Sequence, residues 1–202
     1  NGTDSSLLNI DNINTKTTQN IFIRIVNNKL QCSLDTSGEL LYKRGHRTYS
    51  PRAGLRETLA ASILLASNIK SYKYLFDPMC GSAVFTIEAL LLAYNILPNQ
   101  NHLFPFFNWP CFKKQRFEFA IKSISNSLDK NKEFFAYAAE NHPKEIATAM
   151  QNLNSFILSN KCNFQENDFF IKNNDIPNEK STLIVLNPPY GKRITSKTKD
   201  LY

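Results

Sequence analysis

Apolar and polar residues alternate along this chain in segments that predict its secondary structure. Two β-rich stretches, residues 21–26 and 29–34, are separated by Asn27-Asn28, a pair that favours a tight turn. This pattern predicts a β-hairpin. Residues 1–18 are polar and rich in Asn, Thr and Ser, and we expect them to form a linker.

Beyond residue 50 the pattern changes to alternating strands and helices. A helix is expected from Pro51, with an apolar stripe of Leu55, Leu59, Ile63 and Leu64. The other expected elements are strands at 72–76, 133–139 (ending at Glu140), 162–164 and 183–186, and helices at 84–94 and 113–129. A last helix should begin at Pro143 and bury Ile146, Ala149, Met150, Leu153 and Ile157. Strands that alternate with helices predict an α/β fold with a parallel sheet and helices on its faces.

Composition narrows the class of protein. The chain has 202 residues, of which 42% are hydrophobic and 20% charged, and this balance excludes wholesale disorder. No apolar run is long enough to cross a membrane, and no signal peptide is visible. The four cysteines lie dozens of residues apart, so we expect no zinc site, no disulfide framework and a cytoplasmic location. The first residue is not methionine, so we expect the chain to belong to a longer protein.

Positive charge is concentrated in two places. The formal net charge is +7, which suggests an anionic partner such as nucleic acid. One cluster comprises Lys43, Arg44, His46, Arg47, Arg52 and Arg56, and the other comprises Lys192, Arg193, Lys197 and Lys199. Charge runs are often only solvated surfaces, so both interpretations stay open at this point.

Polar residues follow each of the four predicted strands. The strands end in Asp77-Pro78-Met79-Cys80-Gly81-Ser82, in Glu140, in Asn167-Asp168 and in Asn187-Pro188-Pro189-Tyr190. Any one of these ends could be an ordinary turn or helix cap. Open α/β sheets bind ligands at the carboxyl ends of their strands, however, so the four together predict a ligand site there.

Two of these strand ends resemble motifs I and IV of S-adenosylmethionine-dependent methyltransferases that act on exocyclic base amines. They are residues 77–82 and the segment Asn187-Pro188-Pro189-Tyr190-Gly191-Lys192-Arg193. More narrowly, the chain resembles the THUMP-associated RNA guanine-N2 methyltransferases, such as the bacterial enzymes of large-subunit 23S rRNA. The supporting segments are residues 34–39, 43–47, 55–61, 96–98 and 106–110.

The resemblance implies S-adenosylmethionine as cofactor and RNA as partner, with no metal and no membrane. The cofactor-binding residues would be Asp77, Pro78, Cys80, Gly81, Ser82, Glu140 and Asp168. The target amine would be handled by Asn187, Pro188, Pro189 and Tyr190. Lys43, Arg44, Arg47, Arg52, Lys192 and Arg193 would contact RNA.

The resemblance also implies a fold and a domain organisation. We expect the first four strands of a Rossmann-like class I methyltransferase sheet, preceded by a β-hairpin remnant of a THUMP domain. The expected boundaries are a lead-in at 1–18, the end of the THUMP-type domain with its connector at 19–50, and the N-terminal portion of the methyltransferase domain at 51–202.

One departure from the family pattern concerns motif I. The family usually continues Gly-Ser-Gly-Thr, whereas this chain has Gly81-Ser82-Ala83-Val84. Either the Ala83 methyl crowds the cofactor, or the backbone takes a negative φ there, which alanine tolerates. Ala83 and Val84 motivate one alternative to guanine-N2 methylation, a non-catalytic RNA-binding or assembly protein. A second alternative is an adenine-N6 methyltransferase of DNA or RNA, because the Asn-Pro-Pro-Tyr motif of the resembled families serves both amines.

Overall fold

The computed structural model describes residues 18–45, 54–99, 102–125, 133–154, 156–168 and 181–188. The chain divides into two compact units. The first unit comprises Asn1–Gly45 and Asn95–Lys130, and the second comprises His46–Tyr94 and Asn131–Tyr202. The domain boundaries expected from the sequence stay a prediction.

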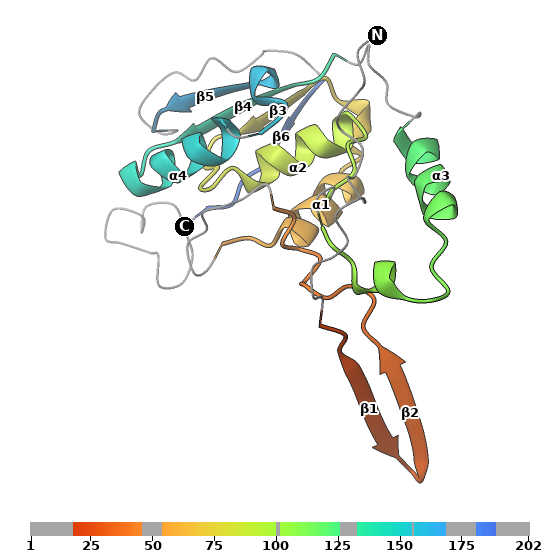
Figure 1. Cartoon of the computed structure of the whole chain (residues 1–202). Coiled ribbons are helices and arrows are strands. Elements are labelled where there is room, and N and C mark those ends of the chain that lie inside the picture. The colour runs from red at the N-terminus through yellow and green to blue at the C-terminus, as the bar shows by residue number, and fades with distance from the viewer. Residues whose placement is uncertain are drawn as a thin grey trace. The chain divides into compact units, whose positions relative to one another are not determined.

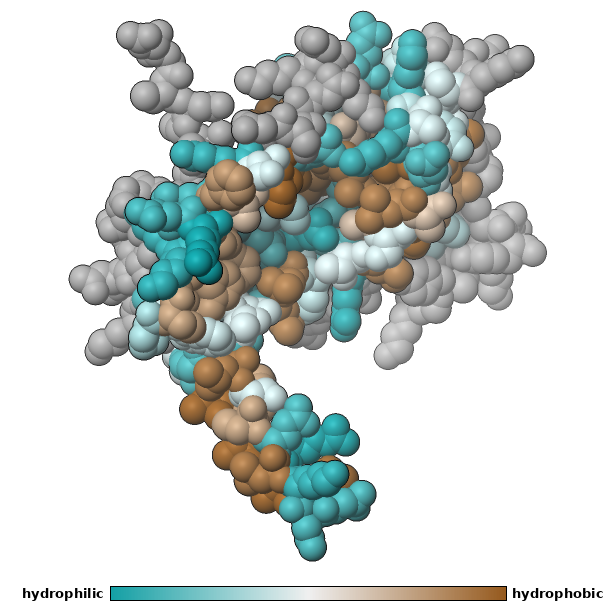
Figure 2. Space-filling view, turned by 90° about the vertical axis from the view of Figure 1, so that its right-hand side faces the viewer, coloured by the Kyte–Doolittle hydropathy of each residue, from teal (hydrophilic) through white to brown (hydrophobic). Residues whose placement is uncertain are grey.

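The first unit contains the predicted hairpin. Strands β1 (Ile21–Val26) and β2 (Lys29–Leu34) pair in antiparallel register. Asn27 and Asn28 both have positive φ, 49° and 58°, the backbone that a tight hairpin turn requires. Exposed apolar side chains line the hairpin, and polar ones gather at its turn (Figure 2).

A short 3₁₀ segment η3 (Pro105–Asn108) and helix α3 (Lys114–Ser125) complete the first unit. The Trp109 Nε1 donates to Gln19 Oε1 at 2.6 Å, and His102 Nε2 lies 2.7 Å from the Ser37 carbonyl oxygen. Five phenylalanine rings, with neighbouring centroids 4.9–5.9 Å apart, form an aromatic cluster of Phe104, Phe106, Phe107, Phe112 and Phe117. The contacts of Trp109 with Gln19 and of His102 with Ser37 join residues 102–117 to the segments that flank the hairpin.

The second unit is a parallel sheet covered by helices, as predicted. The strand order is β5-β4-β3-β6, with β3 (Tyr74–Asp77), β4 (Phe135–Glu140), β5 (Cys162–Glu166) and β6 (Thr182–Ile184) all parallel. Helices α2 (Val84–Ala93) and α4 (Pro143–Asn154) lie over the same face of the sheet (Figure 1). This is the arrangement that right-handed crossovers produce when successive strands are added in one direction. Short 3₁₀ turns, η2 (Ile69–Ser71) and η4 (Ser159–Lys161), precede β3 and β5.

Helix α1 (Glu57–Ala66) differs from the prediction at its start and in its buried face. Residues 54–56 are not helical, and residues 51–53 lie outside the described residues. The helix buries Ala60, Ala61 and Leu64, whereas Leu59 and Ile63 are 51% and 39% exposed. Alanines allow a close approach to α2, which α1 contacts, so Ala60 and Ala61 share the packed face with Leu64 in place of Leu59 and Ile63.

Helix α4 buries most of the predicted face. Ile146, Ala149 and Leu153 are buried, but Met150 and Ile157 are 47% and 70% exposed. The buried face also includes Asn152, whose Nδ2 donates to the Ser82 carbonyl at 3.1 Å. None of the helices in the described ranges could span a membrane.

Candidate active site

Four polar positions meet at one edge of the sheet, as predicted. β3 lies between β4 and β6, and it ends at Asp77, while β4 ends at Glu140. Asp168 comes two residues after the end of β5, and Asn187 three residues after the end of β6. Because all four strands are parallel, these residues share the carboxyl edge.

Asp77 is completely buried at the end of the central strand. Its Oδ2 accepts a hydrogen bond from Thr86 Oγ1 at 3.0 Å, and Thr86 is also fully buried. Burial raises the pKa of Asp77 from 3.8 to about 7, and the nearby charge of Glu140 adds to this rise, while the Thr86 hydrogen bond opposes it. The carboxyl group is therefore poised to change charge near neutral pH.

The loop after Asp77 turns into α2 through two residues in the left-handed region. Gly81 has φ +54°, and a Cβ placed there would meet no atom within 4 Å, so its backbone borders open space. Ala83 has φ +63°, so of the two alternatives considered for this position, the negative φ is wrong. The loop hydrogen bond from Ala83 N to the Cys80 carbonyl (2.8 Å) and the helix bond from Ile87 N to the Ala83 carbonyl (3.0 Å) set this conformation. The Ala83 methyl is fully buried within the protein.

Glu140 joins the loop after β3 to the start of α4. Its Oε2 accepts from the Gly81 amide at 2.8 Å, and its Oε1 accepts from the Asn141 and His142 amides at 3.0 Å each. Asn141 and His142 directly precede α4, so the carboxylate lies near the positive end of the helix dipole, where a negative charge is favourable. Glu140 thus holds two neighbouring strand ends together.

The other two strand ends have their own contacts. The Asp168 side chain, half-buried, accepts from Asn141 Nδ2 at 3.1 Å. Asn187 and Pro188 are also half-buried, and the hydrogen bond from Val185 N to the Phe76 carbonyl (3.0 Å) fastens the segment just before them to β3.

Three more residues predicted to bind the cofactor lie in the loop after β3. Pro78, Cys80 and Ser82 are all buried. Burial raises the pKa of the Cys80 thiol well above its usual value, with Asp77 and Glu140 adding to the effect, so this cysteine stays protonated. Cys162 behaves similarly, since burial raises its pKa to about 12.

The residues predicted to contact RNA are only partly within the described ranges. Lys43 Nζ lies 2.9 Å from Glu39 Oε1, which raises the pKa of the lysine, and Arg44 is half-buried. Both belong to the first unit. Of the residues predicted to contact RNA or handle the amine, six lie outside the described residues: Arg47, Arg52, Pro189, Tyr190, Lys192 and Arg193.

Three supporting residues were not anticipated. Thr86 holds Asp77, Asn152 holds the Ser82 carbonyl, and Asn141 holds Asp168. Thr86 and Asn152 are polar side chains on the buried faces of their helices, and that mismatch is the signal that could have revealed them. Among the described residues, no group of three or more His, Cys, Asp or Glu side chains could hold a metal ion.

The fold defines a class of protein: an open parallel α/β protein whose chain switches direction across the sheet at β3, with polar residues at the carboxyl edge of its strands. Residues 44–202 match the family described as UPF0020, RMKL-like, methyltransferase domain, and the chain belongs to this family.

Comparison with individual proteins supports the same grouping. The chain is 31% identical over 185 residues to the ribosomal RNA large subunit methyltransferase K/L of Vibrio parahaemolyticus, covering 86% of this chain and 25% of that protein. It is similar to the crystal structure of SMU.472, provisionally named a methyltransferase and complexed with SAH, with a TM-score of 0.77 and 27% identity. It also resembles a predicted N6-adenine-specific DNA methylase from Listeria monocytogenes, with a TM-score of 0.73 and 26% identity. Each structural match covers 90% of this chain, and 47% and 46% of those chains respectively, so the chain spans less than half the length of each of these relatives.

Proposed function

We propose that this chain is part of an S-adenosylmethionine-dependent RNA methyltransferase that methylates the exocyclic N2 of a guanine in 23S rRNA. The methyltransferase family, the SAH complex of a structural neighbour and the rRNA methyltransferase relative support this proposal. The observation that carries it is the position of Asn187 and Pro188 at the same sheet edge as Asp77 and Glu140. A cofactor and a base amine held at this edge would meet across neighbouring strands.

The residues at the edge fit the cofactor. Asp77 Oδ1 is buried and has no hydrogen-bond partner among the described residues, so a cationic group nearby would stabilise its ionised form. The open space beside Gly81 lets a ligand approach the backbone closely. Glu140 and Asp168 each offer carboxylate oxygens, suited to ribose hydroxyls and to an adenine amino group. S-adenosylmethionine supplies an electrophilic methyl group on a sulfonium.

The protein's part in the reaction is to orient the amine. Conjugation with the base ring makes the lone pair of an exocyclic amine a poor nucleophile. The Asn187 side-chain carbonyl and the Pro188 backbone carbonyl would accept from the two N–H groups, so that the lone pair turns toward the methyl group. Tyr190 would stack on the base, which has to leave its own stack to enter the site.

Asn187→Ala tests this role. Single-turnover methylation should slow by roughly 10²–10³-fold, while cofactor and RNA affinities stay near those of the wild type. If Asn187 only shapes the turn before Pro188, thermal stability and cofactor binding should fall together. Wild-type turnover in a folded variant would contradict the mechanism.

Identifying the methylated nucleoside in digested rRNA separates guanine N2 from adenine N6. The adenine alternative is motivated by the Asn187-Pro188-Pro189-Tyr190 motif, which serves both amines, and by the similarity to the predicted N6-adenine-specific DNA methylase of Listeria. Methylated adenine would replace our guanine proposal. A protein with RNA affinity but no cofactor affinity would instead fit the non-catalytic alternative, for which Ala83 and Val84 are the motivation.

The same proposal includes the residues that contact RNA, the origin of the hairpin and the cellular location. We assign phosphate contacts to Lys43, Arg44, Arg47 and Arg52, and to Lys192 and Arg193 after motif IV. Neutralising the first four should weaken RNA binding and flatten its salt dependence, while cofactor affinity stays unchanged. A THUMP-type origin of the hairpin and a cytoplasmic location complete the proposal.

A further inference from the structure

Helix α3 carries an exposed aromatic residue that the site described above does not use. Phe119 is 75% exposed, the largest exposed fraction among the large hydrophobic residues of the described ranges. Its neighbour Phe117 lies on the other side of the helix, where its ring contacts Phe106, Phe107 and Phe112. The helix is therefore anchored through one face, and Phe119 lies on the face turned away from the aromatic cluster.

The residues around Phe119 on that face are polar or cationic. Helical geometry places Arg116 one turn before it and Lys122 one turn after it, and both are exposed. Gln115 and Ser123 lie four residues away on either side.

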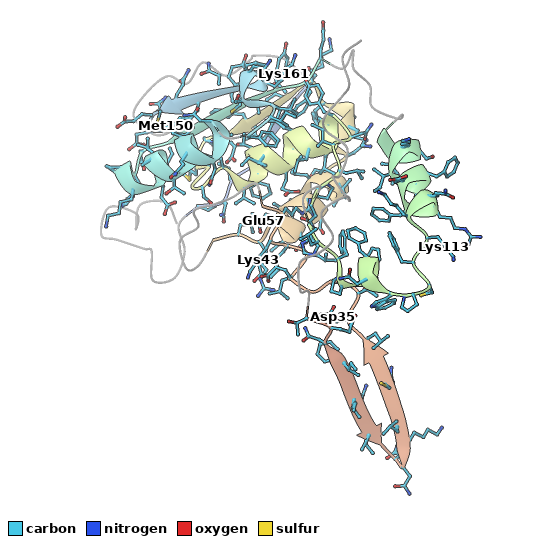
Figure 3. The ribbon with its side chains drawn as sticks, viewed as in Figure 1. Asp35, Lys43, Glu57, Lys113, Met150 and Lys161 are labelled. Atoms are coloured by element: carbon cyan, nitrogen blue, oxygen red, sulfur yellow. The ribbon has the colours of Figure 1, made fainter. Side chains whose placement is uncertain are left out.

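The one acid of α3 lies at the edge of this face. Glu118 is about 100° around the helix from Phe119 and one turn before Lys122. Its Oε1 is 3.9 Å from Lys114 Nζ. Lys113, labelled in Figure 3, directly precedes the helix and adds a further exposed cation. The face formed by Arg116, Phe119 and Lys122 therefore presents a ring between two positive charges.

We propose that this face binds single-stranded RNA, with a base stacked on Phe119 and phosphates held by Arg116 and Lys122. Aromatic rings between cations suit unpaired nucleotides, because every base has a face that can stack and every linkage is an anion. A membrane surface would need a broader apolar face, whereas the apolar side of α3 faces the aromatic cluster and Phe119 is flanked by polar residues. The inference rests on the proposed function in taking RNA as the nucleic acid.

The test measures binding of a short fluorescein-labelled oligouridylate to the whole chain by anisotropy at several salt concentrations. Phe119→Leu should weaken binding roughly 5- to 100-fold without changing the salt slope, because a stacking contact is lost. Phe119→Trp should retain the affinity, since it keeps a stacking ring. Arg116→Gln with Lys122→Gln should lower the slope of log affinity against log salt by about 1.4, the change expected for two phosphate contacts to a single strand.

Matched controls come from the second unit. Ile157→Ala removes an apolar side chain that is 70% exposed, and Lys70→Gln with Lys73→Gln removes two exposed cations. These variants should bind like the wild type. Circular dichroism confirms that each variant is folded.

Three results would overturn the inference: full affinity in Phe119→Leu, an unchanged slope in the double variant, or wild-type binding to phosphatidylserine vesicles but not to the oligonucleotide. Calorimetry with S-adenosylmethionine separates this inference from the proposed function. If the protein lacks cofactor affinity while the α3 variants still weaken RNA binding, methyl transfer is wrong and the RNA-binding face stands.

Discussion

Glu140→Gln removes the carboxylate that holds two strand ends together. Glutamine keeps one carbonyl oxygen, so it can accept from Gly81 or from Asn141 and His142, but not from both sides at once. A hydrogen bond to a charged group contributes about 1.5–3 kcal/mol, and the half-buried position of Glu140 reduces this through solvent screening. We expect the free energy of unfolding to fall by about 1–2 kcal/mol.

Three measurements check this expectation. The melting temperature should fall by roughly 3–6 °C, as this loss implies for a chain of this size. Hydrogen exchange at the Gly81 amide should accelerate, because that amide loses its acceptor. Calorimetry should show S-adenosylmethionine binding weakened by about fivefold or more, because the loop beside the proposed site is no longer held and a charge-assisted contact is lost.

Glu166→Gln is the matched control. Glu166 pairs directly with Glu140 in the sheet register and is exposed, so its substitution removes the same charge from the same edge. Its effect on stability should stay within about 0.5 kcal/mol. Equal losses in both variants would show that net charge, and not the bridge from Gly81 to α4, explains the effect, and would refute the reasoning.

Further predictions concern the buried carboxyl group and the helix that supports it. The pKa of Asp77 is about 7 in the folded protein and 3.8 in its ordinary state, so ionisation of this carboxyl lowers the free energy of unfolding as the pH rises from about 4 to 7. Asp77→Asn should remove this decline, which is at most about 4 kcal/mol, in melting curves measured across that range. Thr86→Val deletes the hydrogen-bond donor to Asp77 at nearly constant volume and should lower the free energy of unfolding by about 1–3 kcal/mol. Denaturant titrations should show the larger loss above pH 7, and an equal loss at pH 4 would contradict this. Asn152→Leu should release the Ser82 carbonyl and destabilise the protein by about 1–2 kcal/mol in the same titrations; unchanged stability would show that this bond is not needed.

The elements that the sequence predicted best depend on local signals. Asn27-Asn28 between two apolar stretches specified the hairpin, and the polar residues after each apolar strand located the site edge. The buried face of α1 was predicted correctly for Leu64 and wrongly for Leu59 and Ile63, because larger residues were weighed above the small ones that fit against another helix. The left-handed φ of Ala83 escaped prediction because it depends on the turn into α2, which alanine alone does not indicate.

The sequence also did not predict which distant segments contact one another. Residues 102–117 lie inside the portion, 51–202, that the sequence assigned to the methyltransferase domain. Their partners, Gln19 and Ser37, lie many residues earlier, and no periodicity links them. Such contacts follow from tertiary packing, which a single sequence does not display.

The register of the hairpin has a practical consequence for its chemistry. Directly paired residues lie on the same face, so Ile21, Ile23, Ile25, Leu30, Cys32 and Leu34 form one apolar face. Cys32 is exposed near its middle, and Cys111 is an exposed cysteine elsewhere in the same unit. Any surface that covers the apolar face would shield the Cys32 thiol from alkylation and leave Cys111 as an internal reference. The ratio of the two labelling rates therefore reports, in any preparation of the protein, whether that face is buried.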